Sequence, residues 1–253
     1  MVETLPNTAR LDYSKREIFL NVSSKIELNT RTRSCAKEPD LVEWIESNFK
    51  AGEVFFDIGA NVGAYSLVAS KFLNDDLRVY SFEPSFITFG QLCRNVQLNG
   101  CSSSITPLQI ALAEKTGIEV LNYNNLEPGG ALHALGACID YKGDAFEPVY
   151  RQPVISFAAD DLLTVLKVPQ PNHIKIDVDG IELPILRGAS NVLKNRQLRS
   201  VVVELEKGTR DESGTLELLT AAGFKLVRCH KCLPGVNAGP LGRMHNYFFL
   251  RHV

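Results

Sequence analysis

The feature that most constrains the fold is the alternation of short apolar runs with helical segments along most of the chain. Residues 54–58 (VFFDI) are almost continuously apolar and predict a buried strand, and residues 64–72 follow as a helix. The same unit recurs, with strands expected at 77–82, 105–113, 118–123, 174–178 and 198–205, and helices at 86–98, 161–166, 184–193 and 215–222. This alternation predicts an α/β fold with a mainly parallel sheet and helices on both faces.

The domain organisation follows from where this alternation begins and where it fails. We expect residues 1–50 to form an N-terminal extension that packs on the core, with a strand at 17–22 and a helix from Pro39, and residues 51–253 to form one domain. The last two strands, 224–229 and 245–250, are too close for a crossover helix and should pair antiparallel at a sheet edge. Residues 124–153, which contain Pro128-Gly129-Gly130, lack clear periodicity and are expected to be a lid-like insert.

Composition excludes several classes of protein. The 253 residues carry 27 Lys and Arg against 29 Asp and Glu, a formal charge of −2, so we expect no nucleic-acid partner. Hydrophobic residues make up 45% of the chain, too many for a disordered one. No apolar run approaches the roughly 18 residues of a membrane span, and the N-terminus is acidic where a signal peptide is basic. These features predict a cytoplasmic protein without a membrane span.

The six cysteines are too sparse for a disulfide framework. Cys229 and Cys232 have the spacing of a metal or redox pair. A zinc site needs four ligands, however, and His245 is the one further candidate nearby. A redox pair usually begins a helix, whereas this pair follows the strand-like run 224–227. We therefore interpret the spacing as a coincidence, with metal binding or redox chemistry as the alternative.

A glycine-rich turn is the most informative motif. Asp57-Ile58-Gly59-Ala60-Asn61-Val62-Gly63 lies between the first buried strand and its helix, where open α/β sheets bind ligands. Gly59 allows close approach of the backbone to a ligand, and Gly63 lets the helix start close by. Glu83 ends the next strand, 20 residues beyond Gly63, and is placed to accept hydrogen bonds from a ribose diol. These residues predict a nucleotide-like ligand.

The spacing of the glycines distinguishes between such ligands. A dinucleotide site typically has the pattern Gly-x-Gly-x-x-Gly, whereas Gly59 and Gly63 are separated by three residues. The carboxylate of Asp57 repels a pyrophosphate and favours a cationic ligand. S-adenosylmethionine carries a sulfonium, an ammonium and a ribose, and we expect it as the cofactor.

Three blocks of the sequence resemble one known family. The stretches DIGANVGAYSL, SFEPSFITFGQLCRNVQLNG and IKIDVDGIELPILRGA are similar to the signature blocks of FkbM-type S-adenosylmethionine-dependent methyltransferases and occur in order between about residues 52 and 206. This chain has Asp179 where the family usually has Glu, and Phe86 where Pro is common.

The resemblance implies a Rossmann-like, seven-stranded methyltransferase fold and transfer of a methyl group to a hydroxyl, often of a sugar or polyketide. It also implies that the cofactor contacts Asp57, Gly59, Asn61, Gly63 and Glu83, with the segment around Ala111 beside the base. The acceptor would be a small molecule or a carbohydrate.

A second acidic cluster is expected to lie beside the cofactor's methyl group. In a strand at 174–178, Lys175 and Asp177 share one face, and we expect them to form an ion pair. Because methyl transfer needs an aligned nucleophile and a proton acceptor, the catalytic candidates are Asp177, Lys175 and Glu204.

Other polar residues near this cluster have competing interpretations. Asp179 and Glu182 can equally be interpreted as helix caps or as site residues. His133 is a candidate base on the insert. Oxygen ligands from Asp177, Asp179 and Glu204 or Glu206 would suit magnesium, but we assign no metal.

Two other functions remain as alternatives. One is an oxidoreductase with a dinucleotide cofactor, which Asp57 and the glycine spacing disfavour. The other is a non-catalytic S-adenosylmethionine-binding module. The presence of Asp57, Glu83 and Asp177 disfavours it.

Overall fold

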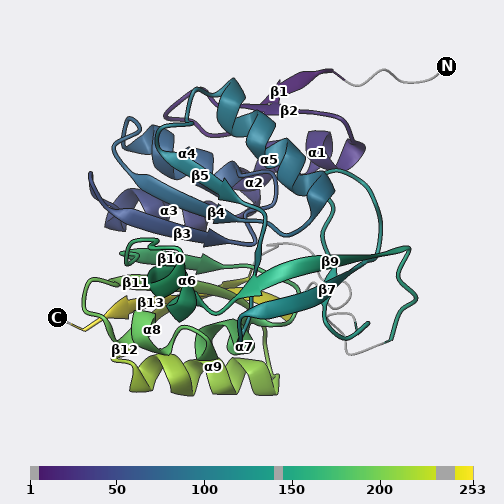
Figure 1. Cartoon of the computed structure of the whole chain (residues 1–253). Helices are drawn as coiled ribbons and strands as arrows, with labels where there is room; N and C mark the ends of the chain where they lie inside the picture. The colour runs from purple at the N-terminus through teal and green to yellow at the C-terminus, as the bar shows by residue number, and fades with distance from the viewer. Residues whose placement is uncertain (1–5, 140–144, 232–242, 253) are drawn as a thin grey trace.

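A seven-stranded sheet forms the centre of the molecule in the computed structural model, which describes residues 6–139, 145–231 and 243–252 (Figure 1). The strand order is β12-β13-β11-β10-β3-β4-β5. The bounds are β3 Val54–Ile58, β4 Arg78–Phe82, β5 Ile105–Leu108, β10 His173–Ile176, β11 Ser200–Glu206, β12 Phe224–Lys231 and β13 Met244–Arg251. Strands β5, β4, β3, β10 and β11 are parallel, and β13 is antiparallel to both β11 and β12. The predicted fold class, including the antiparallel edge pair, is confirmed.

Helices cover both faces of this sheet (Figure 1). On one side lie α3 Pro39–Asn48, α4 Ala64–Phe72 and α5 Phe86–Leu98, together with the short N-terminal α1 Lys25–Asn29, η1 Arg31–Arg33 and α2 Ser34–Lys37. On the other lie α6 Ala159–Val165, α7 Glu182–Arg187, α8 Ser190–Lys194 and α9 Arg210–Ala221. Side chains alternate along each strand, so Phe55 packs in the first core and Phe56 in the second.

Residues 111–157 contribute a second sheet beside the first. Its order is β6-β9-β7-β8, with β6 Ala111–Leu112, β7 Gly117–Tyr123, β8 Ala134–Leu135 and β9 Tyr150–Phe157. Figure 1 shows β7 and β9 as a twisted ribbon projecting beside the central sheet. A further two-stranded sheet pairs β1 Thr8–Arg10 with β2 Phe19–Asn21.

The structure corrects three details of the sequence-based prediction. The strand expected at 105–113 is divided between the two sheets, as β5 and β6. The segment 124–153 is not wholly irregular, because β8 and the first residues of β9 lie in it. Strand β9 escaped prediction because Pro153 interrupts a run that otherwise alternates, with Val154 buried and Ile155 exposed.

The third correction concerns the helix expected at 184–193, which is broken into α7 and α8 around Gly188. A Cβ at Gly188 would lie 2.4 Å from the carbonyl oxygen of Ala113, so the chain passes close to the second sheet at this point. This close contact requires glycine at position 188, and the low helix propensity of glycine also favours the break.

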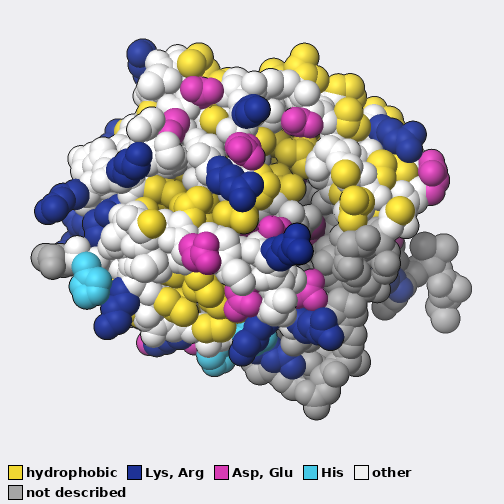
Figure 2. Space-filling view, turned by 90° about the horizontal axis from the view of Figure 1, so that it is seen from below, with side chains coloured by type: hydrophobic (Ala, Val, Ile, Leu, Met, Phe, Trp, Pro, Cys, Tyr) yellow, Lys and Arg dark blue, Asp and Glu magenta, His cyan; other side chains and the backbone are white. Residues whose placement is uncertain are grey.

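Figure 2 shows the face on which α9 lies, where basic and acidic side chains are interspersed rather than segregated. No helix among the described residues is long and apolar enough to cross a membrane. The five described cysteines are free thiols, and Cys232 and the Pro234-Gly235 turn lie outside the described residues. The interpretation of the Cys229–Cys232 spacing as a coincidence, with a metal or redox pair as the alternative, therefore stays untested.

Candidate functional site

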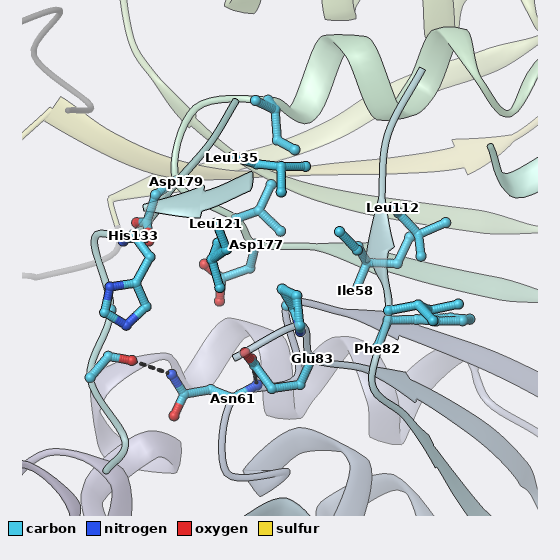
Figure 3. A pocket seen from close by; sticks show the side chains of 18 of the residues that line it. Ile58, Asn61, Phe82, Glu83, Leu112, Leu121, His133, Leu135, Asp177 and Asp179 are labelled. Carbon is cyan, nitrogen blue, oxygen red and sulfur yellow. Dashed lines mark hydrogen bonds between the residues drawn. The ribbon is translucent and has the colours of Figure 1, made fainter. Parts of the chain in front are cut away.

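A cavity lies where the carboxyl ends of β3, β4 and β10 meet at the edge of the central sheet (Figure 3). The cavity is partly open to solvent and has both an apolar and a polar wall. Its apolar wall includes Ile58, Phe82, Ile110, Leu112 and Leu121. Its polar wall includes Asn61, Glu83, His133, Asp177 and Asp179. Figure 3 shows Phe82 and Leu112 on one side, His133 and Asp179 on the other, and Glu83 and Asp177 between them.

The glycine-rich turn after β3 forms the floor of this cavity. Gly59 has a φ of +74°, and a Cβ there would lie 1.9 Å from the backbone oxygen of Asp177, so the position requires glycine. Asn61 also adopts a left-handed conformation, which Asn tolerates better than most residues. At Gly63, a Cβ would lie 2.5 Å from Leu92 Cδ1, which explains the close packing of α4 against α5. The turn thus brings the backbone of β3 against the end of β10.

Glu83 is held rigidly at the end of β4. Its side chain accepts hydrogen bonds from the backbone N–H groups of Asn61, at 3.0 Å, and Ser85, at 2.9 Å. Burial raises the pKa of Glu83 to about 7, although these two hydrogen bonds favour its charged form. The carboxyl group therefore lies in the cavity wall at a fixed position, with acceptor capacity remaining for a ligand's hydroxyl groups.

A segment of the insert covers one side of the cavity. We call residues 128–133 the strap. Its carbonyl groups accept hydrogen bonds from Ser24 Oγ at Pro128, from Arg31 Nε at Gly129 and from Asn61 Nδ2 at Gly130, with distances of 2.7, 2.9 and 2.8 Å. Its other end donates the backbone N–H groups of Leu132 and His133 to Asp179 Oδ2. Asp179, interpreted from sequence as a helix cap or site residue, thus anchors the strap.

Lys175 forms a buried ion-pair cluster with Asp57 and Asp177 beside the glycine turn. Its ammonium lies 2.9 Å from Asp177 Oδ2 and 3.5 Å from Asp57 Oδ1. Burial alone would lower the pKa of Lys175, but the two carboxylates outweigh this effect and raise it above its ordinary value. Burial likewise opposes ionisation of Asp177, yet Lys175 and Lys37 hold its pKa well below the usual range. The predicted Lys175–Asp177 pair is present, and Asp177 is a charged group at neutral pH.

A smaller cavity lies next to this cluster and shares Arg31, Gly59, Asn61 and Asp177 with the larger one. Its remaining wall includes Lys37, Glu38, Tyr65 and Lys175. The hydroxyl of Tyr65 donates to Glu38 Oε2 at 2.5 Å, and Asn246 Nδ2 donates to Glu38 Oε1 at 2.9 Å. Both oxygens of Glu38 are therefore engaged within the protein.

The predicted site residues fall into two groups in the structure. Gly59, Asn61, Glu83, Ala111 and Asp177 line the larger cavity, and Lys175 lines the smaller one. Asp57 is fully buried behind the wall and accepts a 2.6 Å hydrogen bond from Ser66. Gly63 also lies outside the cavity wall, in the start of α4. The roles of all these residues as ligand contacts stay predictions.

Glu204 lies half-buried near the carboxyl end of β11, the strand that pairs with β10. When Glu204 is protonated it can donate a hydrogen bond to Asp177, which favours the ionised form of Asp177 and adds to the larger effect of Lys175 on its pKa. The predicted catalytic residues Asp177, Lys175 and Glu204 thus belong to one electrostatic cluster.

Sequence reasoning missed the contribution of the N-terminal segment. Arg31 and Lys37 face the cavities from η1 and α2, elements too short to give a periodic signal. His133 was singled out from sequence, and the structure places it in the cavity wall. Burial lowers the pKa of His133 to about 4, so its imidazole is neutral at pH 7.

Two further carboxyl groups near the cavity titrate unusually. Burial, followed by the negative charge of Asp177, raises the pKa of Asp179 to about 6. Burial raises that of Glu182 to about 8, against the hydrogen bond that it accepts from the N–H of Gly180. Such perturbed groups concentrate at functional sites. Among the described residues, no group of three or more His, Cys, Asp or Glu is arranged to hold a metal ion.

Comparisons with known proteins agree with this geometry. Residues 57–226, more than half of the chain, match the family described as the methyltransferase FkbM domain. A hexuronic acid methyltransferase from Haloferax volcanii, AglP, is 26% identical over 192 residues, which cover 76% of this chain and 72% of the relative.

Two solved structures share the fold at low sequence identity. The methyltransferase FkbM of Methylobacillus flagellatus matches 79% of this chain and 44% of its own, less than half its length, with a TM-score of 0.53 and 18% identity. The M. jannaschii TYW2 structure in complex with AdoMet matches all of this chain and 90% of its own, with a TM-score of 0.51 and 12% identity.

Proposed function

Because the chain belongs to the FkbM family of methyltransferases, we propose that it transfers a methyl group from S-adenosylmethionine to an oxygen of a sugar or another small natural-product acceptor. The observation that carries this proposal is that Glu83 and Asp177 line one cavity at the carboxyl ends of the parallel strands. They lie on either side of the point where Gly59 closely contacts β10. Family membership favours a methyltransferase over the dinucleotide oxidoreductase considered above.

The residues present fit S-adenosylmethionine, which when bound supplies a methyl group made electrophilic by a sulfonium sulfur. Glu83 has acceptor capacity toward the cavity for the ribose hydroxyls, and the carboxylate of Asp177 attracts the cofactor's cationic end. The wall formed by Phe82, Ala111 and Leu112 suits the flat adenine ring.

Asp177 is the group that we assign to the acceptor. Its carboxylate is fixed by Lys175 at 2.9 Å and retains 31% exposure of its side chain, so it can accept a hydrogen bond from an acceptor hydroxyl. Because its pKa is low, Asp177 orients that hydroxyl and stabilises positive charge more effectively than it removes a proton. Lys175 remains protonated and positions Asp177, and Glu204 supports the same carboxylate from β11.

The N-terminal extension and the insert are the proposed determinants of the acceptor. Residues 31–38 and the strap each contribute to the cavity walls from outside the central sheet. The relative from Haloferax volcanii is a hexuronic acid methyltransferase, which supports a carbohydrate acceptor for this chain as well.

An acceptor screen tests the proposal directly. The full chain is incubated with S-adenosylmethionine labelled in its methyl group and with neutral sugars, uronic acids and hydroxylated natural products, and the products are identified by mass spectrometry. Label on an acceptor oxygen supports the proposal. Label on nitrogen or carbon contradicts O-methylation, and cofactor binding without turnover on any acceptor favours the non-catalytic module.

The assignment of Glu83 is tested by binding rather than by turnover. Replacing Glu83 with Gln keeps the side-chain shape but removes the charged acceptor of two ribose hydrogen bonds. We expect affinity for S-adenosylhomocysteine, measured by calorimetry, to fall by about 10- to 100-fold. Glu119→Gln, a change on β7 outside the cavity wall, is the matched control. Unchanged affinity in Glu83→Gln would show that Glu83 does not contact the cofactor.

A further inference from the structure

Arg31 is the cation at the junction of the two cavities. It lies in the short helix η1, is half-buried, and lines both the larger and the smaller cavity. Its Nε donates to the carbonyl oxygen of Gly129, at 2.9 Å. Within the described residues, its two terminal NH₂ groups have no hydrogen-bond or ion-pair partner. A guanidinium that is tethered at Nε and free at its fork is suited to bind a carboxylate in bidentate geometry.

The other cations of the smaller cavity are engaged differently. Lys175 lies between Asp57 and Asp177, and the ammonium of Lys37 lies 3.5 Å from the carboxylate of Glu38. Both lysines therefore neutralise protein carboxylates. Arg31 is instead near Glu83 and Asp179 without being in ion-pair contact with either.

The charges of the cavity are complementary to a ligand with mixed charge. Asp177, Asp179 and Glu83 favour the sulfonium and ammonium groups of S-adenosylmethionine, but they repel its carboxylate. The same repulsion acts on the carboxylate of an acidic sugar. A bound carboxylate therefore needs a cation in the wall, and Arg31 has unpaired donors at the point where the cavities join.

We propose that the free guanidinium fork of Arg31 binds a carboxylate of one of the two reactants, either the amino-acid carboxylate of the cofactor or that of a uronic-acid acceptor. The second source rests on the proposed function, whereas the first requires the cofactor alone. Arg31 precedes the segment that matches the family, so this contact lies outside the residues that define the family.

The experiment separates the two sources by calorimetry on the full chain. Arg31→Met is compared with the unaltered protein for binding of S-adenosylhomocysteine and of methylthioadenosine, which has the same nucleoside and thioether but no amino-acid end. If Arg31 binds the cofactor, affinity for S-adenosylhomocysteine falls by about 10- to 100-fold and affinity for methylthioadenosine is unchanged.

The second arm measures acceptor binding to the S-adenosylhomocysteine complex. If Arg31 binds the acceptor, the substitution leaves affinity for S-adenosylhomocysteine unchanged but weakens binding of glucuronate by a similar factor, without affecting glucose. Failure of the acceptor screen above leaves the first arm intact, so the two proposals fail separately.

Two control variants exclude indirect effects. Arg33→Met removes an exposed arginine from the same turn and is expected to change nothing. Ser24→Ala removes the hydrogen bond to Pro128 and the N-cap of α1, so it loosens the strap and the start of this helix without removing the guanidinium, and it is expected to weaken both ligands less than Arg31→Met weakens its carboxylate ligand. Two results overturn the proposal. One is that Arg31→Met weakens binding of S-adenosylhomocysteine and of methylthioadenosine equally. The other is that Arg31→Met changes neither the binding of S-adenosylhomocysteine nor that of glucuronate.

Discussion

The two ends of strand β10 carry similar chemistry with different surroundings. His173 and Lys175 are two residues apart on the same face, both are buried, and both pair with an acid of neighbouring β3 or just before it. At the amino end, His173 Nε2 lies 2.8 Å from Glu53. At the carboxyl end, Lys175 lies 3.5 Å from Asp57.

The amino end is closed and its hydrogen bonds are complete. His173 Nδ1 lies 2.7 Å from Ser200 Oγ, which also accepts the indole N–H of Trp44, and Phe49 stacks on the imidazole at 4.0 Å. Glu53 is further paired with Arg199. This cluster of histidine, serine and acid resembles a hydrolase triad in composition, but it is sealed by aromatic rings and serves stability.

The carboxyl end is incomplete. Asp57 Oδ1 is buried and has an ion pair with Lys175 at 3.5 Å but no hydrogen bond among the described residues, and Asp177 is partly exposed to the cavity. A buried charge with incomplete hydrogen bonding costs free energy, and proteins retain such a group where a ligand or a reaction depends on it. The contrast teaches that the surroundings of such a cluster, rather than its residue types, identify the functional end.

The largest expected effect is that of Lys175→Met. The substitution leaves Asp57 buried without its cation, so the free energy of unfolding should fall by about 3–5 kcal/mol in chemical denaturation. Lys175→Met with Asp57→Asn removes both charges and should recover much of this loss. A single variant as stable as the unaltered protein would contradict the view that Asp57 depends on Lys175.

Glu53→Gln tests the closed end of the strand. The amide retains the size of the side chain but loses the charge that pairs with Arg199 and strengthens the hydrogen bond to the neutral His173, so we expect a loss of about 1.5–3 kcal/mol in denaturant unfolding. Affinity for S-adenosylhomocysteine should stay the same, because Glu53 lies at the opposite end of the sheet. Weakened cofactor binding at equal folded fraction would break the distinction between the two ends.

The smallest expected effect is the change of unfolding free energy with pH, which is at most about 1.4 kcal/mol per pH unit for each group. This change should have opposite signs for His173 at one end and Glu83 at the other. Burial lowers the pKa of His173, so the unfolded chain binds more protons and stability falls as the pH drops below about 6.5. At the other end, burial raises the pKa of Glu83 to about 7, so the folded chain holds its proton and stability falls as the pH rises from about 4 toward 7.

Two variants separate these slopes in unfolding experiments between pH 5 and 8. His173→Phe should remove the loss of stability that occurs as the pH drops below about 6.5, and Glu83→Gln should remove the loss that occurs as the pH rises toward 7. If His173→Phe instead alters the slope above pH 7, the neutral form of His173 in the folded state is the wrong assignment.

The central sheet and the glycine turn were predictable because their signals are local. The buried strand, Gly59, Gly63 and the helix after them are contiguous, and Glu83 follows at a short fixed distance. The ends of α4 and α5 were predicted to the residue for the same reason.

The rest of the site depends on contacts between distant residues. Arg31 meets Gly129 across 98 positions, and no local pattern links them. The strap contains one proline and two adjacent glycines and has no regular periodicity, so its ordered position comes from contacts with Asn61 and Asp179 rather than from its own propensity. Asp57 was predicted because of its motif, but whether its side chain faces the ligand or the core is decided by the pairing with Lys175.

The attachment of the strap has an evolutionary consequence. Ser24, Arg31 and Asn61 bind the main-chain carbonyls of three consecutive residues, and Asp179 binds main-chain N–H groups. Main-chain partners are supplied by almost any amino acid. Gly129 and Gly130 leave no room for a Cβ, but the other side chains of the strap are less constrained and can diverge among descendants of this chain, so that acceptor preference can drift while the anchoring remains inherited unchanged.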